Sequence, residues 1–283
     1  MAVGAATCYG LTVVLNRSLA RAGMSAPEVL SVRFAVATVG TFAIVRALGR
    51  PLRPVPGEWG RAVLLGIVGY AGQTAFFFSA LQRGTAAAVT LVFYAYPAFV
   101  TLLEALFGWQ PIDRRRVSAL VLSAGGTALV VAGGSEVTIS PAGALLAVGA
   151  AVAFGTYLLA GNRLLPRSDG LTSAAWVACG AALSWLTVAV VTGGRPEAGD
   201  HVPALVANGA ATALAFGLMF LALRRIGAGR TAVAMTAEAA SAVALAALFL
   251  GEGLRPLQAV GGVVILVAAV LVARSKAAPA SVA

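Results

Sequence analysis

The stretch TAVAMTAEAASAVALAALFLGE, residues 231–252, is an apolar run with one carboxylate, Glu238, near its middle. A helix that spans a bilayer needs about 20 residues, so this run is long enough to cross a membrane. Placing an ionisable side chain at membrane depth costs roughly 2.5–3.5 kcal/mol on insertion scales, so such a residue usually faces a polar interior. The residues around Glu238 are mostly small, which lets neighbouring helices approach closely. The stretch therefore predicts one wall of a cavity near the membrane midplane.

The composition of the whole chain is that of a polytopic membrane protein. Of 283 residues, 60% are hydrophobic and 11% are charged, and the mean hydropathy is +0.92. A soluble domain is typically about 25% charged, so no soluble domain is expected. The net charge of +10 comes from arginines in short loops between apolar runs. That distribution favours membrane topology and headgroup contact, and no nucleic-acid partner is expected.

Ten apolar segments can be marked, and glycine, proline and charged residues separate them. They lie near residues 3–20, 28–48, 60–81, 86–108, 117–134, 141–162, 171–192, 203–223, 230–250 and 256–273. The predicted fold class is an all-α integral membrane protein with ten transmembrane helices. If the N-terminus is cytoplasmic, the inside loops and tail carry 14 lysines and arginines and the outside carries 5, with Arg33 left out because it lies within a segment. The positive-inside rule then places both termini in the cytoplasm, in a multi-pass protein of the cytoplasmic (inner) membrane.

The first apolar run begins close to Met1 without a basic stretch, so no cleavable signal peptide is expected. The two cysteines lie inside apolar runs, and the single histidine lies in a polar loop. None of them has the spacing of a metal site, so neither a metal nor a cofactor is predicted.

The two halves of the chain are similar to each other. Residues 79–131 can be written above residues 221–273, at an offset of 142, and Tyr96 then falls at Glu238 and Pro97 at Ala239. Each half holds five apolar segments. An odd number of crossings reverses the orientation of the second half, which predicts two inverted five-helix repeats, 1–135 and 136–283, in one structural unit. This architecture places a binding site at the bilayer midplane between the repeats.

Several degenerate motifs recur in a fixed order along the chain. They are the aromatic–glycine pairs Tyr9-Gly10 and Phe154-Gly155, the pair Arg33-Phe34, the run ALQRGTAAAVTLVFYAYPAFVTLLEALFGWQP, and Gly251-Glu252 followed by Gln258 and Gly261. Through these motifs the chain resembles the EamA-type ten-helix exporters of the drug/metabolite transporter superfamily, over essentially its whole length. It departs from their pattern at Ala239, where they have proline, and at Gln110, where they have glutamate. The resemblance implies export of small metabolites, often amino acids or related compounds, across the cytoplasmic membrane.

Glu238 is the first candidate for substrate binding. It would bind a cationic group of the substrate or take up and release a proton; the alternative is a structural partnership with a neighbouring arginine or hydroxyl. The third and eighth segments are the expected lining pair, because they occupy equivalent places in the two repeats. Their stripes contain Gly66, Tyr70, Gln73 and Phe77, and Asn208, Thr212, Ala215 and Met219. Such stripes suit a cavity that packs an apolar group and hydrogen-bonds a polar one, and the alternative for Gln73 and Asn208 is helix-to-helix bonding.

Further candidates lie in four other segments. Tyr94 and Tyr96 flank Pro97, a predicted hinge, because proline interrupts the helical hydrogen bonds. Tyr9, Asn16, Phe154 and Tyr157 are expected to face the same cavity. Arg33 is interpreted as snorkelling to the headgroups or capping the cavity. Glu104 and Glu252 are interpreted as structural or gating partners of loop arginines such as Arg114 and Arg255, and Trp59, Trp109 and Trp185 as interfacial anchors.

The competing function classes have little support in the sequence. An intramembrane enzyme would need a convergent catalytic set, and no HExxH, GxSxG or phosphate-binding GxxxxGK[ST] motif occurs. A channel usually needs a filter sequence or rings from several subunits, and an assembly subunit remains as a further alternative. The sequence predicts a secondary transporter of a small molecule in a lipid bilayer, monomeric or homodimeric, that works by alternating access, with proton coupling left open.

Overall fold

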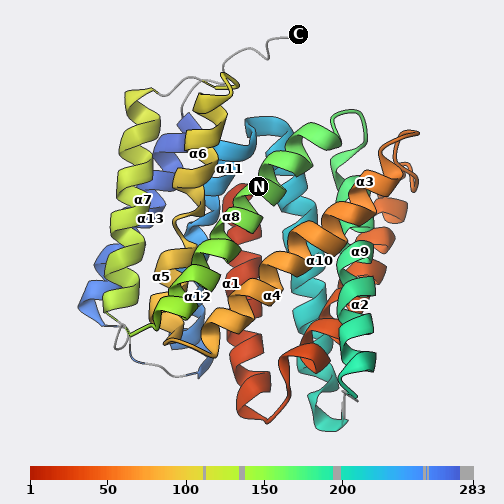
Figure 1. The fold of residues 1–283 in the computed structure, drawn as a ribbon, viewed down its shortest axis with the longest axis horizontal. Helices are drawn as coiled ribbons and strands as arrows, with labels where there is room; N and C mark the ends of the chain where they lie inside the picture. The colour runs from red at the N-terminus through yellow and green to blue at the C-terminus, as the bar shows by residue number, and fades with distance from the viewer. Residues whose placement is uncertain (111–112, 134–137, 194–198, 251–252, 254, 275–283) are drawn as a thin grey trace.

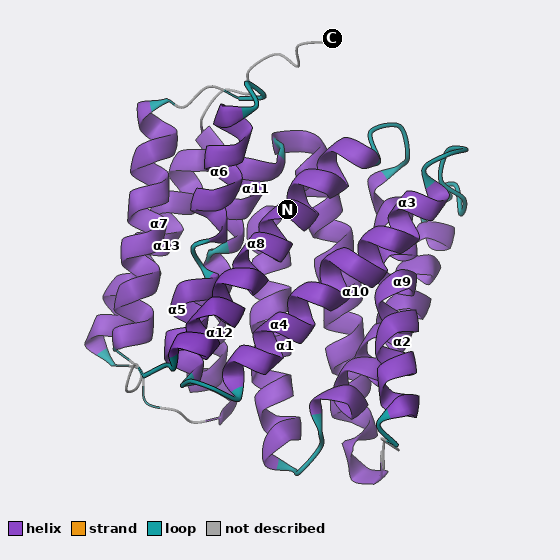
Figure 2. Cartoon of the chain, viewed as in Figure 1, coloured by secondary structure: helices purple, strands orange, loops and turns teal. Residues whose placement is uncertain are grey.

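The computed structural model describes residues 1–110, 113–133, 138–193, 199–250, 253 and 255–274. Within these ranges the chain is helical throughout, and short loops join the helices (Figure 2). The only β-type pairing in this part of the chain is an isolated bridge between Gly84 and Ile139. The boundary predicted at residue 135 and the pair Gly251-Glu252 lie outside the described residues.

The helices follow the predicted apolar segments. In chain order they are α1 (Ala2–Arg21), α2 (Ala26–Ala47), α3 (Trp59–Leu64), the π-helix η1 (Leu65–Tyr70), α4 (Ala71–Leu81), α5 (Ala86–Phe93), α6 (Tyr96–Leu106), α7 (Arg114–Ala132), α8 (Pro141–Leu164), α9 (Gly170–Val191), the short 3₁₀ turn η2 (Gly199–His201), α10 (Val202–Ile226), α11 (Ala228–Met235), α12 (Ala237–Leu250) and α13 (Pro256–Arg274). With α3–η1–α4, α5–α6 and α11–α12 each taken as one span, eight spans in the described chain are long and apolar enough to cross a membrane. The protein is therefore an all-helical, multi-pass membrane protein.

Polar side chains define several helix starts. The Ser25 backbone N–H donates to Glu28 Oε2 over 2.8 Å, which closes a capping box at the start of α2. Asp113 accepts from the backbone N–H of Arg116 at the start of α7, and Asp169 accepts from the N–H groups of Leu171 and Thr172 at the start of α9. Each cap satisfies backbone donors that lack a partner within the helix, so the loops between spans can stay short.

Two of the spans are interrupted near their centres. α5 ends at Phe93 and α6 begins at Tyr96, because Pro97 has no N–H and its ring would clash with the Phe93 carbonyl of a continuous helix. The α11–α12 span is interrupted at Thr236 although Ala239 stands where a proline was expected. There the Thr236 hydroxyl and backbone N–H both donate to the Val233 carbonyl, over 2.7 and 3.2 Å. A threonine that turns its hydroxyl onto its own backbone thus interrupts the α11–α12 span without proline.

The helices pack side by side in pairs. In Figure 1, α7 and α13 lie together at one edge of the bundle and α2 and α9 at the opposite edge, while α1 packs between α10 and α12. Gly126 and Gly261 let α7 and α13 come close: a Cβ atom on Gly126 would lie 2.8 Å from the Gly261 carbonyl oxygen. Small residues allow such close helix contacts where lipid provides no hydrophobic driving force.

Candidate functional site

A cavity of about 120 Å³ lies between helices from both halves of the chain. Its lining comes from α1, α2, η1, α4, α5, α8 and α12, and consists of Tyr9, Thr12, Val13, Asn16, Arg33, Tyr70, Gln73, Thr74, Phe77, Phe78, Phe93, Phe154 and Glu238. Aromatic and aliphatic side chains form much of this wall, and a few polar groups are set among them, as in small-molecule sites generally. An engineered cavity of 150 Å³ holds benzene, so the free space here suits a compact molecule.

Glu238 is the carboxylate in this lining. It is the second residue of α12, directly after the interruption at Thr236. The N-terminal end of a helix carries partial positive charge, which favours a carboxylate at this position. Across the described part of the chain, no hydrogen bond or ion pair of the Glu238 side chain is found. Its carboxylate is thus placed in the cavity with its acceptor sites open.

Arg33 is the second charged residue in the lining, and it comes from α2. Its side chain is buried, with the residue 5% exposed, so the interpretation that it snorkels to the headgroups is wrong. Arg33 Nε donates to Thr212 Oγ1 over 2.7 Å, and Thr212 Oγ1 donates in turn to the Asn208 carbonyl over 2.8 Å. Asn208 Nδ2 donates to Asn16 Oδ1 over 2.6 Å. This network joins α2 to α10 and α10 to α1.

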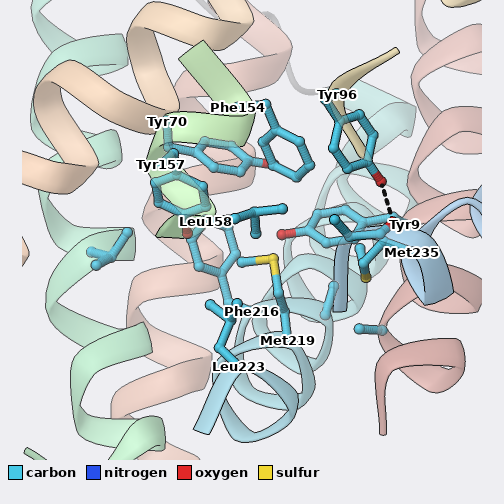
Figure 3. Packing of buried hydrophobic residues seen from close by; sticks show 14 of the residues in the cluster. Tyr9, Tyr70, Tyr96, Phe154, Tyr157, Leu158, Phe216, Met219, Leu223 and Met235 are labelled. Atoms are coloured by element: carbon cyan, nitrogen blue, oxygen red, sulfur yellow. Dashed lines mark hydrogen bonds between the residues drawn. The ribbon is translucent and has the colours of Figure 1, made fainter. Parts of the chain in front are cut away.

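An aromatic cluster closes the cavity on one side. Tyr70 lies against Phe216, with ring centroids 4.8 Å apart, and against Tyr157, at 5.4 Å (Figure 3). Tyr96 meets Phe154 edge to face at 4.8 Å, and its hydroxyl donates to the Ala232 carbonyl over 3.2 Å, the dashed line in Figure 3. That bond connects α6 to α11, so on this side the two interrupted spans touch.

The cavity extends away from this cluster. Its residues from Thr12 to Asn16 lie in the half of α1 nearest loop 22–25, and its residues from Gln73 to Phe78 lie in the half of the α3–η1–α4 span nearest loop 82–85. α6 packs against α11, whereas α5 and α12 make no comparable contact within the described chain. The cavity therefore approaches the end of the bundle where those two loops lie, and the opposite end is closed.

The structure brings together some of the predicted site residues and separates others. The residues that line the cavity are Tyr9, Asn16, Tyr70, Gln73, Phe77, Phe154 and Glu238. The residues buried outside its lining are Tyr94, Tyr96, Tyr157, Asn208, Thr212 and Met219. Asn208 and Thr212 belong to the network that holds Arg33, so α10 supports the site from behind its wall. Pro97 stands in the first turn of α6, next to the interruption.

Sequence reasoning missed Thr12, Val13, Thr74, Phe78 and Phe93 as lining residues, and it gave Arg33 only as an alternative cap of the cavity. A signal for Arg33 was present, because an arginine inside an apolar segment is as costly in lipid as a glutamate. Trp185 was interpreted as an interfacial anchor, which is wrong: it is 6% exposed, and its Nε1 donates to Thr74 Oγ1 over 3.2 Å. It thus supports the cavity wall from α9.

A buried ion pair lies at the closed end of the bundle. Glu104 in α6 pairs with Arg116 in α7, and Glu104 Oε1 also accepts from the backbone N–H of Gly229 in α11 over 2.9 Å. Glu104 is 4% exposed and Arg116 is 6% exposed. The arginine partner is thus Arg116, and the expectation of Arg114 is wrong; Glu252 lies outside the described residues. The pair ties α6, α7 and α11 into one contact.

At the same end of the bundle, a second carboxylate, Glu58, links two loops through hydrogen bonds. Glu58, directly before α3, accepts from the backbone N–H groups of Arg167 and Ser168 over 3.0 and 2.9 Å. Burial by itself would raise the pKa of Glu58, but these hydrogen bonds, with that of the Ser168 side chain, outweigh burial and hold the pKa below its ordinary value. The ionised carboxylate therefore connects the α2–α3 loop to the α8–α9 loop.

The comparisons with known proteins bear on the whole chain. A family model described as the EamA-like transporter family matches residues 1–132 and again residues 141–274. The chain belongs to the EamA-like transporter family. This EamA-like protein is accordingly a membrane transporter by family, and the family is one of transporters rather than enzymes.

A solved crystal structure of another protein is similar to this EamA-like chain, with a TM-score of 0.76 and 22% sequence identity. The match covers 94% of this chain and 95% of the other. At this identity the likeness shows a shared fold. No curated protein sequence matches the chain significantly.

Proposed function

We propose that this EamA-like protein is a secondary transporter that exports a small, amino-acid-like or related metabolite across the cytoplasmic membrane by alternating access. In this proposal ten transmembrane helices form two inverted five-helix repeats, 1–135 and 136–283, and both termini lie in the cytoplasm. The substrate and the lipid bilayer are its partners, and no cofactor takes part. The single observation that carries the proposal is the carboxylate of Glu238 in a cavity, directly after a break in its span and without an ion pair to any described residue.

The positions of the two helix interruptions support the repeat. At the offset of 142, Tyr94 aligns with Thr236, and these are the residues at which α5 and α11 stop. The α5–α6 interruption has a proline, Pro97, and the α11–α12 interruption has Ala239 at the equivalent place. A proline therefore cannot be the reason that both spans are interrupted at the same position of the repeat. The family model matches the chain twice, on either side of residues 133–140, which also supports a division near residue 135. Interrupted helices at a midplane site are common in transporters built from inverted repeats.

Alternating access would use the asymmetry between the two ends of the bundle. The closed end carries the α6–α11 contact, with the Tyr96–Ala232 hydrogen bond and the Glu104–Gly229 hydrogen bond across it. In the proposed orientation this end is cytoplasmic, and the structure would then represent a state closed toward the cytoplasm. Opening that end would part α6 from α11, and the breaks at Tyr94 and Thr236, with Pro97 beside the first, would serve as hinges.

Within the cavity, Glu238 would bind a cationic group of the substrate or a coupling proton. Gln73 would donate or accept a hydrogen bond, and the Tyr9 hydroxyl, buried without a hydrogen-bond partner in the described residues, is available for another. Phe77, Phe93 and Phe154 would pack against apolar parts of the substrate. Desolvated, preorganised polar groups of this kind give a small site its selectivity.

The test is counterflow in proteoliposomes that contain the purified protein. Vesicles are loaded with a mixture of unlabelled amino acids, and uptake of radiolabelled amino acids is followed with and without a pH gradient. Wild-type protein should show uptake that the internal load accelerates, and Glu238→Gln should lose that uptake or its response to the pH gradient. Glu28→Gln is the matched control, because glutamine preserves the capping box at the start of α2 and Glu28 lies outside the cavity lining.

Each other result contradicts part of the proposal. Flux that the internal load does not accelerate would indicate a channel. The absence of flux for any solute would favour an assembly subunit. Unchanged counterflow in folded Glu238→Gln protein would remove Glu238 from the mechanism.

A further inference from the structure

A groove of about 380 Å³ lies on the outer surface of the bundle, between the α3–η1–α4 span and α8. Within these elements, η1 and α4 pack against α8 (Figure 1). Both spans are long and apolar enough to cross a membrane, and several of the lining side chains are exposed, namely Leu64, Val68, Phe76 and Leu164. The groove shares no lining residue with the cavity that contains Glu238. It is therefore a separate feature that opens toward the lipid hydrocarbon.

The depth of the groove comes from two glycines, Gly69 and Gly72, with Tyr157 of α8 below them. A Cβ atom on Gly69 would lie 3.1 Å from Tyr157 Cδ2, whereas one on Gly72 would meet no atom within 4 Å. The Tyr157 ring centroid lies 5.4 Å from that of Tyr70 and 5.8 Å from that of Phe154 (Figure 3). Because these rings hold Tyr157 in place, its side chain does not fill the space that the glycines leave. The groove is thus preformed.

The length of the groove matches one leaflet of a bilayer. On the first span its lining runs from Arg61 to Phe76, roughly 20 Å at the rise of a helix. On α8 it runs from Leu164, the last residue of the helix, to Ala153, roughly 16 Å. The hydrocarbon of one leaflet is about 15 Å deep, half of the bilayer core. A single acyl chain that lies along the two helices would therefore fill the groove.

The charge of the groove is concentrated at its loop end. Among the described residues that line it, Arg61 carries the only formal charge. Arg61 is exposed and forms no ion pair or hydrogen bond with a described residue. The acid one helical turn earlier, Glu58, is 3% exposed, and its carboxylate is occupied by the backbone N–H groups of Arg167 and Ser168. Trp59, 54% exposed, lies beside Arg61 at the start of α3, as expected at the level of lipid headgroups.

We propose that this groove binds one anionic phospholipid, with an acyl chain packed against Tyr157 and the lipid phosphate on Arg61. A guanidinium binds a phosphate through two parallel N–H···O bonds. Every phospholipid has that phosphate, but a zwitterionic headgroup adds a cation, which no acidic residue of the described lining can pair. A lipid with one net negative charge pairs the single positive charge of the groove. In the proposed orientation the lipid belongs to the cytoplasmic leaflet, where anionic lipids give the surface a negative potential.

The test is native mass spectrometry of the purified, delipidated protein in detergent micelles. It is titrated with dioleoyl phosphatidylglycerol or with dioleoyl phosphatidylcholine, which have the same chains and differ in net charge. The wild type should bind the first phosphatidylglycerol molecule about fivefold more tightly than the first phosphatidylcholine, the factor expected for one basic residue near an anionic surface. Glycerol 3-phosphate has the phosphate without the chains. It should not bind at the same concentrations, because an exposed ionic contact alone contributes little.

Two variants assign the headgroup and the chain to separate parts of the groove. Arg61→Gln should remove the preference for phosphatidylglycerol while phosphatidylcholine binding stays the same. Gly72→Leu places a side chain in the groove and should weaken the binding of both lipids several-fold, because chains in an apolar environment are held by packing. Arg53→Gln, in the exposed loop before α3, and Gly125→Leu, at an exposed helical glycine with open space around its Cβ position, are the matched controls and should change neither affinity. Because Arg61 is exposed, Arg61→Gln tests the site even if Gly72→Leu fails to fold.

The other outcomes overturn the inference in different ways. Equal affinity of the wild type for the two lipids, or an unchanged preference in Arg61→Gln, would refute the anionic-lipid site. Unchanged affinities in folded Gly72→Leu would remove the groove from lipid binding, and the loss of a wild-type dimer in that variant would assign the groove to a second copy of the chain. Binding of glycerol 3-phosphate as tight as that of the lipid would indicate a site for free phosphate compounds. None of these measurements involves transport, so the result is independent of the proposed function.

Discussion

Replacing Glu104 with glutamine is expected to destabilise the folded protein by about 3–5 kcal/mol, the usual cost of leaving one member of a buried ion pair uncompensated. The structure favours this range because both partners are almost fully buried, with Glu104 4% exposed and Arg116 6% exposed. Arg116 Nε already lacks a hydrogen-bond partner among the described residues. After the substitution, the Arg116 charge would therefore lose its ionic partner in a desolvated site.

Glutamine is the informative replacement because it isolates the charge. Its amide oxygen can still accept from the Gly229 N–H, a bond of 2.9 Å in the wild type, so the α6–α11 hydrogen bond survives. Arg116→Met should be destabilising for the reciprocal reason, since it leaves the Glu104 carboxylate with that single donor. The double variant Glu104→Gln/Arg116→Met removes both charges and keeps a side-chain oxygen that accepts from the Gly229 N–H. Its free energy of unfolding should lie within about 1–2 kcal/mol of the wild type, because exchanging a whole buried pair for neutral groups is often close to neutral.

The assay is reversible unfolding in mixed micelles, followed by circular dichroism, for the wild type, the two single variants and the double variant. The coupling energy between the two sites, taken from the double-mutant cycle, should be several kcal/mol and insensitive to salt, because buried charges are poorly screened. A Glu104→Gln variant within 0.5 kcal/mol of the wild type would refute the reasoning. So would a double variant that costs as much as the two single variants added together.

Three further predictions use other contacts. Gly126→Ala should destabilise the protein by about 1–3 kcal/mol in the same unfolding assay, because the new Cβ atom would collide with the α13 backbone. Gly125→Ala is the control: no atom lies within 4 Å of its Cβ position, so it should be neutral or stabilising by up to about 1 kcal/mol. The folded pKa of Glu58 lies below its ordinary 4.5, so its stabilising contribution is present above about pH 4.5 and is lost as the pH falls through the folded pKa. The difference in unfolding free energy between wild type and Glu58→Gln should therefore shrink on acidification. A difference that stays constant with pH would contradict this role of Glu58. With the two native cysteines replaced, Gln82→Cys should react with an impermeant maleimide in intact cells and Arg53→Cys only after permeabilisation, and the reverse pattern would overturn the proposed orientation.

Much of the fold could be predicted from the pattern of apolar runs and their punctuation. Eight spans long enough to cross a membrane follow from the length and composition of the runs, since a helix is the way for a single segment to satisfy its backbone hydrogen bonds in lipid. The break at Pro97 follows from the missing N–H of proline. The break at Thr236 does not, because threonine is compatible with a continuous helix and its inward hydrogen bond to Val233 depends on the local backbone.

The candidate site divides in the same way. The sequence identified Glu238 as the acid at membrane depth, because a carboxylate in an apolar run is conspicuous whatever surrounds it. It identified only part of the cavity lining: Tyr9, Asn16, Tyr70, Gln73, Phe77 and Phe154 share the cavity with Glu238. Arg33, Thr74 and Phe93 line the cavity, whereas Asn208 and Thr212, which seemed equally suited, stand behind its wall.

The physical reason is that the sequence of a membrane helix reveals little about which of its faces points toward the protein interior. In a soluble protein the buried face is apolar and the exposed face polar, so periodicity reveals which residues point inward. In a bilayer both faces of a helix contact apolar surroundings, so Ala, Val and Leu occur both at positions that face lipid and at positions that face protein. The sequence by itself therefore determined the spans, the family and the acid at mid-depth. Only the tertiary packing of α1, α2, η1, α4, α5, α8 and α12 decided which side chains meet that acid, and that Glu104 pairs with Arg116 rather than Arg114.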